Sequence, residues 1–458
     1  MTRRDFLRGS LAGAACLGLC GLPLPAYGAK KPNVVIIFCD DLGYQDVGCF
    51  GSPNIKTPKL DQMATEGMRF TSFYSAAPVC TPSRAALLTG CYPQRVNLPQ
   101  VINYSHSIGI SSKEITLAEL LRGEGYATAC IGKWHLGWQK EFLPTRHGFD
   151  YYYGLPYSND MKYGDDKVPL IRGEEIIEQP AVLETLTERY TDEAIRFIRK
   201  HSDEPFFLYL PHTFPHTPLA ASEEFLGKSR GGLYGDVVEC IDWSAGRIME
   251  TLKELGLDDN TLVVFTSDNG PWLVKGKDGG SALPLRSGKG TTWEGGMREP
   301  TIMRWPGRIP AGTTCSEMAT TMDLLPTIAA LAGTKAPTDR IVDGKDIRPL
   351  MMGEPGAASP HEAFYYYRAD ELQAVRSGKW KLVLEHIDRP GKTDVPQALY
   401  DLEKDIGETT DVSAKYPSIV KRLETLARKC REDLGDALTG AVGRNRRPCG
   451  QVKQAPAG

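Results

Sequence analysis

The sequence predicts an α/β fold with a mainly parallel central sheet flanked by helices, followed by a smaller α+β domain with an antiparallel sheet. Between residues 30 and 345, short apolar segments rich in β-branched residues alternate with amphipathic segments, which is typical of such a sheet. After residue 345, short strand-like segments follow one another and lead into a single helix. Four of the early apolar segments end in polar side chains, at the place where open α/β sheets bind ligands.

The individual elements follow from hydrophobic runs and the residues that interrupt them. In the large domain, residues 30–345, strands are predicted at 34–38, 126–131, 206–210 and 261–266, and helices at 80–89, 116–123, 186–200 and 236–256. In the small domain, residues 346–440, strands are predicted at 364–367, 372–376, 380–385 and 398–402, and an amphipathic helix near 417–434. Residues 441–458 are polar and basic, and we expect them to form a loose tail.

The composition describes a globular protein and gives no support for nucleic-acid binding. The chain has 458 residues, 41% of them hydrophobic, which is enough to bury a large core. Its formal net charge is -3, whereas a nucleic-acid-binding protein needs a basic surface.

The first 29 residues have the features of a bacterial export signal. Arg3-Arg4 and Phe6-Leu7 precede an apolar run at 11–24 and small residues at 26–29, which is the order found in a twin-arginine signal peptide. The alternative is an uncleaved membrane anchor. No other segment is long and apolar enough to span a bilayer, so we expect a periplasmic or secreted protein.

The cysteines do not define a disulfide framework. Two of the eleven, Cys16 and Cys20, lie in the export signal, and the other nine are scattered without a CxxC pair. If one of the nine is chemically converted, eight remain, and Cys430 with Cys449 is one candidate bridge. The sequence leaves the connectivity open.

Two pairs of oxygen-bearing side chains predict a metal site. Asp40-Asp41 and Asp268-Asn269 each follow an apolar strand. Four hard oxygen ligands suit Ca²⁺ or Mg²⁺, whereas zinc prefers thiolate and imidazole. Either pair alone is explained as well by capping of a turn or helix, but two pairs at two strand ends favour a metal.

Cys80 begins a predicted helix in the segment CTPSRAALLTG, which has Pro82 in its first turn and Gly90 at its end. The N-terminus of a helix attracts an anion, and Arg84, one turn further on, offers two donors to a tetrahedral oxyanion. The residues alone leave two readings: a buried structural thiol, or a thiolate nucleophile with a lowered pKa.

Basic side chains follow the other two strand ends. Lys133 and His135 come after the strand at 126–131, and His212 and His216 come after the strand at 206–210. The two later histidines have the spacing of a helical zinc pair, but a proline precedes each of them and disfavours a helix. Gly288-Lys289 suggests a phosphate-binding loop, but the segment lacks the other residues of that motif. Lys289 is then either a residue of the site or a solvated lysine in a loop.

Together these motifs resemble those of the type I, formylglycine-dependent sulfatases. The match at 80–90 is long and specific, and residues 143–160 are similar to the arylsulfatase A-like branch. The other matching segments, in the order of the family, are residues 32–43, 132–137, 287–296, 399–402 and 407–408. The resemblance implies an alkaline-phosphatase-like large domain and hydrolysis of sulfate esters, with sulfated carbohydrates as the expected substrates.

The resemblance also implies how the nucleophile and the metal are supplied. In the family the cysteine of this motif, which corresponds to Cys80 here, is oxidised to formylglycine. One hydroxyl of the hydrated aldehyde then attacks the sulfur of the sulfate ester and forms a covalent sulfo-enzyme intermediate. One calcium ion assists this reaction. Its implied ligands are Asp40, Asp41, the modified Cys80, Asp268 and Asn269.

The resemblance assigns roles to the basic residues as well. His135 would take the proton when the intermediate collapses, and His216 with Lys289 would hold or protonate the leaving oxygen. His216 is preferred over His212 because residues 216–218 match the family's His-x-Pro pattern, which leaves His212 with a substrate-binding or a structural role. The cations that would neutralise the sulfate oxygens are Arg84, Lys133 and Lys289.

Two other functions fit part of the pattern. A phosphomonoester or phosphodiester hydrolase on the same fold would carry a Ser or Thr nucleophile and zinc-binding His and Asp residues. A secreted glycan-binding protein with an inactive site would lack catalytic positions, and none is missing here. We therefore expect a sulfated small molecule or glycan as the substrate and a formylglycine-generating enzyme as the maturation partner. The sequence leaves open which ester is cleaved.

Overall fold

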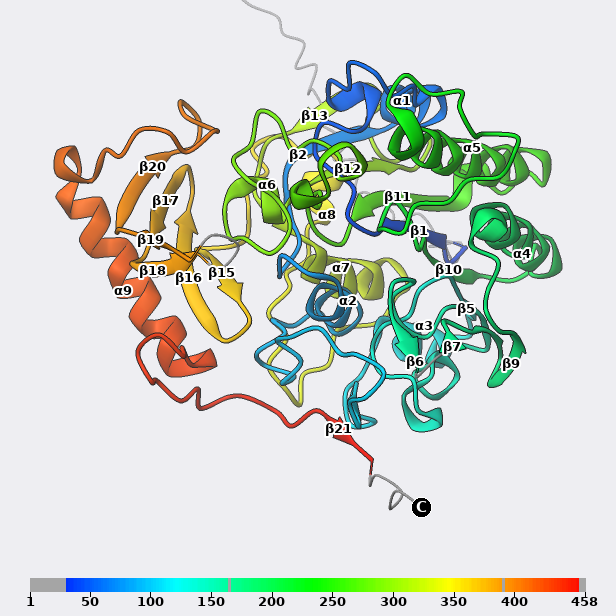
Figure 1. Ribbon diagram of the computed structural model, residues 1–458, viewed down its shortest axis with the longest axis horizontal. Helices are drawn as coiled ribbons and strands as arrows, with labels where there is room; N and C mark the ends of the chain where they lie inside the picture. Colours follow the sequence, from blue (N-terminus) through cyan, green and yellow to red (C-terminus); the bar gives the residue numbers. More distant parts are fainter. Residues whose placement is uncertain (1–29, 164–165, 389–391, 453–458) are drawn as a thin grey trace, which may run out of the picture. The chain divides into compact units, whose positions relative to one another are not determined.

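The computed structural model describes residues 30–163, 166–388 and 392–452 (Figure 1). The predicted export signal at residues 1–29 lies outside these residues. The chain from Lys31 onward forms one compact unit, so the boundary expected at residue 345 stays a prediction. Within the described part of the chain, no helix is both long and apolar enough to cross a membrane.

The large sheet is parallel in its middle, as predicted. The five strands from β11 to β5 pair in parallel, and β12 pairs antiparallel with both of its neighbours. In order across the sheet the strands are β13 (Thr313–Cys315), β2 (Met68–Tyr74), β12 (Arg298–Arg304), β11 (Thr261–Ser267), β1 (Asn33–Cys39), β10 (Phe206–Pro211), β4 (Ala127–Ile131), β5 (Tyr151–Gly154), β8 (Leu170–Arg172) and β9 (Glu175–Glu178), while β14 (Ala319–Thr320) also pairs with β2.

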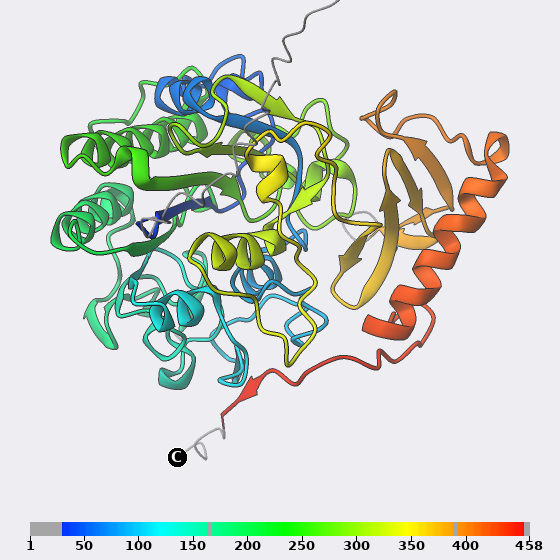
Figure 2. The ribbon, with the colours of Figure 1, turned by 180° about the vertical axis from the view of Figure 1, so that it is seen from behind.

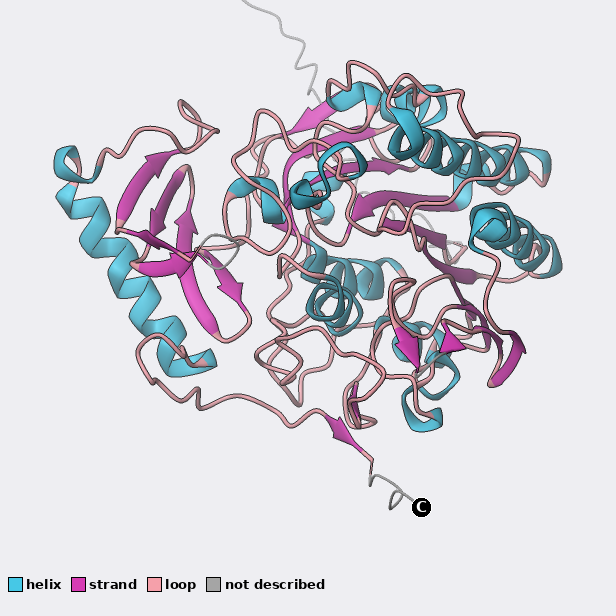
Figure 3. Cartoon of the chain, in the orientation of Figure 1, coloured by secondary structure: helices cyan, strands magenta, loops and turns pink. Residues whose placement is uncertain are grey.

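Helices cover both faces of this sheet, which explains why β1 is apolar from Val34 to Cys39. Successive side chains of a strand point to opposite faces. Val35 and Ile37 belong to one core and Val34 and Ile36 to another. The first core includes α1 (Pro58–Glu66), α4 (Leu186–Lys200) and α5 (Gly232–Glu254), and the second includes α2 (Cys80–Thr89), α3 (Leu117–Gly123) and α7 (Leu324–Leu331) (Figure 3).

The small domain is an antiparallel sheet covered by one helix, again as predicted. Its strands run in the order β15 (Phe364–Arg368), β16 (Glu371–Ser377), β17 (Trp380–Val383) and β20 (Ala398–Asp401). Figure 2 shows α9 (Pro417–Leu434) lying along this sheet. The remaining α-helices and strands of the described residues are α6 (Glu294–Met297), α8 (Arg348–Met351), β3 (Ile108–Gly109), β6 (Lys162–Tyr163), β7 (Asp166–Lys167), β18 (His386–Asp388), β19 (Thr393–Val395) and β21 (Gly450–Gln451).

The tail after residue 440 was expected to be loose, and through residue 452 this expectation is wrong. β21 pairs antiparallel with β3. Arg447 forms an ion pair with Glu114 at 2.8 Å, and Arg446 forms one with Asp370 at 2.9 Å. The basic residues that suggested a solvated tail thus meet carboxylates elsewhere in the fold. We call residues 441–452 the C-terminal strap.

The candidate bridge between Cys430 and Cys449 is also absent. Every cysteine that the structure describes is a free thiol. Cys430 is buried on α9, where its sulfur lies 3.2 Å from the hydroxyl of Tyr367. Cys449 lies on the C-terminal strap, with its sulfur 3.9 Å from Asn97 Nδ2. The helix and the strap therefore direct the two thiols to different surroundings.

Candidate active site

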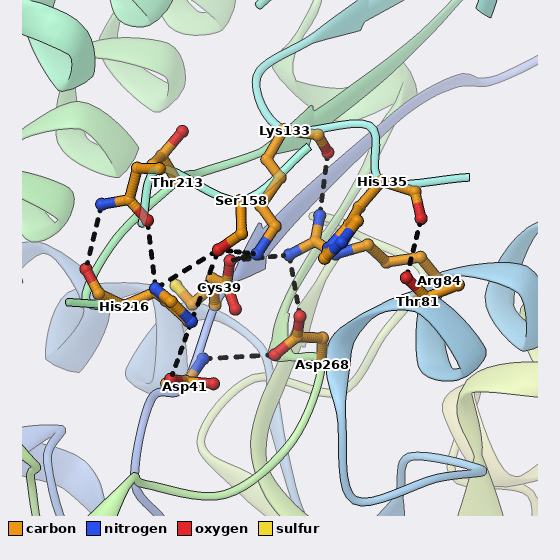
Figure 4. Close-up of polar contacts among 12 residues, drawn as sticks. Cys39, Asp41, Thr81, Arg84, Lys133, His135, Ser158, Thr213, His216 and Asp268 are labelled. Carbon is orange, nitrogen blue, oxygen red and sulfur yellow. Dashed lines mark hydrogen bonds and ion pairs between the residues drawn. The ribbon is translucent and has the colours of Figure 1, made fainter. Parts of the chain in front are cut away.

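The side chains predicted to act together meet at one edge of the large sheet (Figure 4). β1 lies between β10 and β11 and pairs in parallel with both, so all three strands end at the same edge. β4 is the next strand beyond β10. Asp40, Lys133 and Asp268 follow the ends of β1, β4 and β11, and all three are fully buried. The parallel topology therefore assembles the predicted site.

The two predicted metal-binding pairs lie in direct contact. The backbone N–H of Asp41 donates to Asp268 Oδ1 at 3.2 Å, and Asn269 Nδ2 donates to Asp41 Oδ1 at 2.8 Å. Asp41 adopts a left-handed backbone conformation with φ 68°, which is unusual for a residue other than glycine. Such strain is held only where the surrounding structure enforces it, and it is frequent at functional sites.

These oxygen atoms fit a bound calcium ion. Asp40 Oδ1 and Asn269 Oδ1 are buried without a hydrogen-bond partner among the described residues, although buried polar atoms are nearly always paired. Ligand atoms of Asp40, Asp41 and His216 lie within 4.8 Å of one another. Carboxylate and amide oxygens are the ligands that calcium prefers, so the donor set matches the ion implied by the sequence motifs.

Three cations from the same chain neutralise the three carboxylates. Lys133 Nζ donates to Asp40 Oδ2. Arg84 forms an ion pair with Asp268 at 2.8 Å, and Lys289 forms one with Asp41 at 2.7 Å. A buried charge requires such a partner because its desolvation is otherwise very costly. We call Asp40, Asp41, Arg84, Lys133, Asp268 and Lys289 the site cluster.

The charges of the site cluster separate the pKa values of its carboxyl groups. Burial acts to raise the pKa of Asp40, but Lys133 and other nearby cations hold it well below its usual value. Burial and the charge of Asp40 raise the pKa of Asp268 to about 7. A nearby cation stabilises the charged form of a carboxyl group, so metal binding would favour the ionised form of Asp268.

Cys80 begins α2, all of whose residues are buried. Val79 supplies no side-chain cap to this helix, so the dipole at the helix N-terminus faces the cysteine without a competing side chain. Burial raises the pKa of the Cys80 thiol, although Lys133 and Lys289 act to lower it. The raised pKa gives no support to the reading of Cys80 as a thiolate nucleophile with a lowered pKa.

His135 presents one unpaired ring nitrogen. It also has a left-handed backbone, with φ 61°. Its Nε2 lies 2.7 Å from the carbonyl oxygen of Ile102. A carbonyl only accepts, so Nε2 carries the proton. The other nitrogen, Nδ1, is buried without a hydrogen-bond partner among the described residues. Burial and the charge of Lys133 lower the pKa of His135 well below its usual value, which keeps Nδ1 available as a proton acceptor.

His216 is oriented by Asn159, and Lys133 has a partner in Ser158; the sequence suggested no role for either residue. Asn159 Oδ1 lies 3.0 Å from His216 Nδ1, and Asn159 Nδ2 donates to the carbonyl of Pro218 at 3.0 Å. This fixes the amide, so Nδ1 carries the proton and Nε2, 3.8 Å from Asp41, faces the site cluster. Ser158 Oγ accepts from Lys133 Nζ at 3.1 Å. The resemblance at 143–160 was the only sequence signal for either residue.

His212 is not part of this hydrogen-bonded arrangement. The residue is fully buried, and neither ring nitrogen has a hydrogen-bond partner in the described part of the chain. Its ring centroid lies 6.4 Å from that of Tyr190, a core residue of α4. Its substrate-binding role therefore remains a prediction without support from these contacts.

Comparisons with known proteins identify the family. A family model described as "Sulfatase" matches residues 32–334, which is more than half of the chain. The chain belongs to the sulfatase family. A second model, described as "N-sulphoglucosamine sulphohydrolase, C-terminal", matches residues 288–433. The resemblance on which the site residues were chosen is thereby confirmed at the level of the family.

The relatives of this sulfatase cover most of its length. N-acetylgalactosamine-6-sulfatase of Canis lupus familiaris is 43% identical over 80% of this chain and 73% of its own. Arylsulfatase A of Bos taurus is 40% identical over 87% of this chain and 88% of its own. The crystal structure of Ps i-CgsB in complex with k-i-k-neocarrahexaose, 33% identical, has a TM-score of 0.78 and covers 87% of this chain and 92% of that one. This sulfatase is thus a sulfuric ester hydrolase with the predicted fold.

Proposed function

We propose that this sulfatase hydrolyses sulfate esters of carbohydrates with a formylglycine nucleophile made from Cys80 and with one bound calcium ion. The observation that carries the proposal is the position of Cys80. It lies at the start of a fully buried helix, and the charges of Lys133, Lys289, Asp40 and Asp268 all act on it. A nucleophile at this point faces both the cations that suit a sulfate and the oxygens that suit a metal.

The charge balance of the site cluster supports the same conclusion. Three carboxylates offset three cations, so the cluster by itself gives little net attraction for an anion. The ion would be held by Asp40, Asp41, Asp268, Asn269 and the modified Cys80. Bound there, calcium would activate the nucleophile and polarise the sulfate ester. The added positive charge would also leave the chain's own cations free to contact the sulfate oxygens.

The cations and the two histidines of the site would have separate roles in the reaction. Arg84, Lys133 and Lys289 would offset charge on the sulfate oxygens in the transition state, where such stabilisation is most effective. The free Nδ1 of His135 would accept the proton that is released when the enzyme is regenerated. His216 Nε2 and Lys289, both beside Asp41, would face the leaving oxygen.

The substrate class is inferred from relatives. One relative is named for N-acetylgalactosamine 6-sulfate, and a structural neighbour was crystallised with k-i-k-neocarrahexaose. We therefore propose a sulfated glycan or sulfated sugar as the substrate. The segment at residues 1–29 supports export through the twin-arginine route, and the Cys80 motif supports maturation by a formylglycine-generating enzyme.

The modification is tested by mass spectrometry of the tryptic peptide from Phe70 to Arg84, taken from protein made in its native host. Conversion to formylglycine replaces one sulfur and two hydrogens by one oxygen, and we expect this mass change in most of the peptide. A peptide that carries an intact Cys80 would refute the nucleophile that we propose.

The activity is tested by measuring sulfate release from a panel of esters by the matured enzyme. The panel holds an aryl sulfate, sulfated monosaccharides and disaccharides, and intact sulfated polymers, with an aryl phosphate as control. We expect release from at least one sulfated sugar. Turnover of the phosphate alone would show that the fold is correct and the proposed function is not.

A further inference from the structure

A cavity of about 470 Å³ lies between residues 99–101 of the large domain and the turn that joins β15 to β16 in the small domain. Its size is within the roughly 300–1,000 Å³ range of small-molecule sites. We propose that this cavity binds the sugar ring that carries the sulfate, and that it selects a ring without a second anionic group. The inference rests on the proposed function and names the part of the molecule that recognises the substrate.

The walls of the cavity are continuous with the segments that carry the proposed chemistry. Val79, which lines the cavity, directly precedes Cys80. Arg368, on the opposite wall, donates from Nε to the carbonyl of Gly290 at 2.8 Å, and Gly290 directly follows Lys289. The N–H of Gly290 in turn donates to the carbonyl of Pro78 at 2.9 Å. The cavity therefore adjoins the two segments that carry the proposed nucleophile and the leaving-group lysine.

The wall contributed by the small domain is held rigidly. Gln94 Nε2 donates to the carbonyl of Ala369 at 2.6 Å, which ties the turn to the large domain. The N–H of Ala437 donates to the carbonyl of Asp370 at 2.8 Å. Arg446 of the C-terminal strap pairs with the Asp370 carboxylate at 2.9 Å. A binding site that is fixed before the ligand arrives loses less conformational entropy on binding.

The lining combines polar and apolar groups in a way that suits a pyranose. Gln100, Arg368, Asp370 and Glu371 provide hydrogen-bonding groups, and the other lining residues are Val79, Pro99, Val101, Ala369 and Ala437. Sugar hydroxyls both donate and accept, whereas the C–H faces of the ring are apolar. The lining has two carboxylates and one guanidinium, and Arg446 beside it pairs with Asp370. A second sulfate or a uronate on the same ring would therefore meet no excess of positive charge to offset its desolvation, which is costly for a buried anion.

The first test fills the cavity with a large side chain and compares the variant with a matched control. Gln100→Trp fills the cavity from an exposed position, and we expect it to raise KM for N-acetylgalactosamine 6-sulfate about tenfold or more, since the ring loses its hydrogen bonds and its space. Gln397→Trp, at an exposed position away from the cavity lining, is the matched control and should leave KM unchanged. Thermal unfolding of both variants checks that the fold is kept.

Asp370→Asn removes one carboxylate and preserves the shape of the side chain. The parent enzyme should have a kcat/KM for N-acetylgalactosamine 6-sulfate about tenfold higher than for N-acetylgalactosamine 4,6-disulfate. In Asp370→Asn the ratio of these two values should be smaller. Asp394→Asn, at an exposed position outside the cavity lining, is the matched control and should keep the preference of the parent enzyme.

The outcomes separate the cavity from the function. If the parent enzyme cleaves the sugar sulfate and neither Gln100→Trp nor Asp370→Asn alters KM or the preference, the cavity is not the sugar site and the proposed function stands. Turnover of phenyl sulfate without turnover of any sulfated sugar overturns both the cavity assignment and the carbohydrate substrate. Failure of the matured enzyme to cleave any sulfate ester overturns the proposed function itself.

Discussion

The protein contains two buried charge clusters that use similar residues for different purposes. The site cluster lies at the edge of the large sheet, as described above. The second, which we call the interdomain cluster, lies between α6 and the small sheet and consists of Tyr74, Glu294, Arg298, Tyr366, Lys381 and Glu408. Both contain lysine, arginine and carboxylate side chains removed from water.

The difference between the two clusters is how completely they are paired. Glu294 accepts from the hydroxyls of Tyr74 at 2.5 Å and Tyr366 at 2.8 Å, and Lys381 lies 3.1 Å from it. Lys381 also forms an ion pair at 2.6 Å with Glu408 Oε1, the one atom of this cluster without a hydrogen-bond partner among the described residues. The site cluster and its neighbours instead leave several buried atoms without hydrogen-bond partners in the described residues, namely Asp40 Oδ1, Arg84 Nε, His135 Nδ1 and Asn269 Oδ1. A closed network supports the fold, whereas an open one is suited to a ligand.

The largest expected effect is on stability, from Glu294→Gln. Removing this charge leaves Lys381 and Arg298 short of a buried partner, which costs about 3–5 kcal/mol in the free energy of unfolding. Sulfate release per folded molecule should stay unchanged, because Glu294 belongs to the closed cluster. Chemical denaturation and specific activity measure the two quantities, with the exposed Glu362→Gln as control. A loss of activity at full stability would mean that the clusters are not functionally distinct.

The corresponding change in the site cluster is Lys133→Ala. We expect kcat for a sulfate ester to fall about 100- to 1,000-fold, as when one group that stabilises transition-state charge is removed. Steady-state kinetics provide the measurement, and Lys113→Ala, at an exposed position, is the control. If turnover survives in Lys133→Ala, this lysine does not contact the sulfate.

Calcium should stabilise the protein through the site cluster alone. A ligand at about 100 times its Kd adds about 2.7 kcal/mol to the free energy of unfolding. We expect addition of calcium to chelator-treated enzyme to raise the thermal midpoint and to restore sulfate release. Glu294→Gln should keep the calcium-dependent gain, whereas Asp40→Asn should lose it. An equal gain in Asp40→Asn would place the ion elsewhere.

The last expected effect is a pH dependence of the interdomain cluster. Burial raises the pKa of Glu408 to about 7, with Lys381 opposing the shift and Glu294 adding to it. Since folding raises this pKa above that of the unfolded chain, Glu408 makes stability fall as pH rises from about 4.5 to 7, by at most about 1.4 kcal/mol per pH unit. Glu408→Gln should lack this decline, so it should gain stability relative to the parent over that interval. Parallel thermal unfolding curves for the two proteins across this range would contradict the assignment.

Several parts of the site were readable from the sequence because they lie in short continuous motifs. Asp40-Asp41 and Asp268-Asn269 follow apolar strands whose pattern is unmistakable, and Cys80 with Arg84 lies in one helical turn. Parallel strands bring their carboxyl ends to one edge, so the meeting of these residues followed from the fold class. The roles that we assign to them remain to be tested.

Other features depend on contacts between residues far apart in the chain. The orientation of His216 by Asn159 and the separation of Cys430 from Cys449 had no local signal. The basic strap was predicted to be a solvated tail because its partners, Glu114 and Asp370, lie 333 and 76 residues away along the chain. The local sequence pattern predicts which polar groups follow a strand and where the strand ends. It does not predict which distant residue a long side chain will contact.

The amino-acid sequence by itself therefore determined the α/β class, the strand ends and the family motifs, because these depend on hydrophobic period and on neighbouring residues. Only the tertiary structure decided which charges are fully paired and which are left open. It also decided that residues 99–101 and the turn between β15 and β16 enclose a cavity that is lined in part by Val79, the residue before Cys80. The physical reason is that pairing and enclosure depend on distances in space between segments that the chain itself keeps far apart.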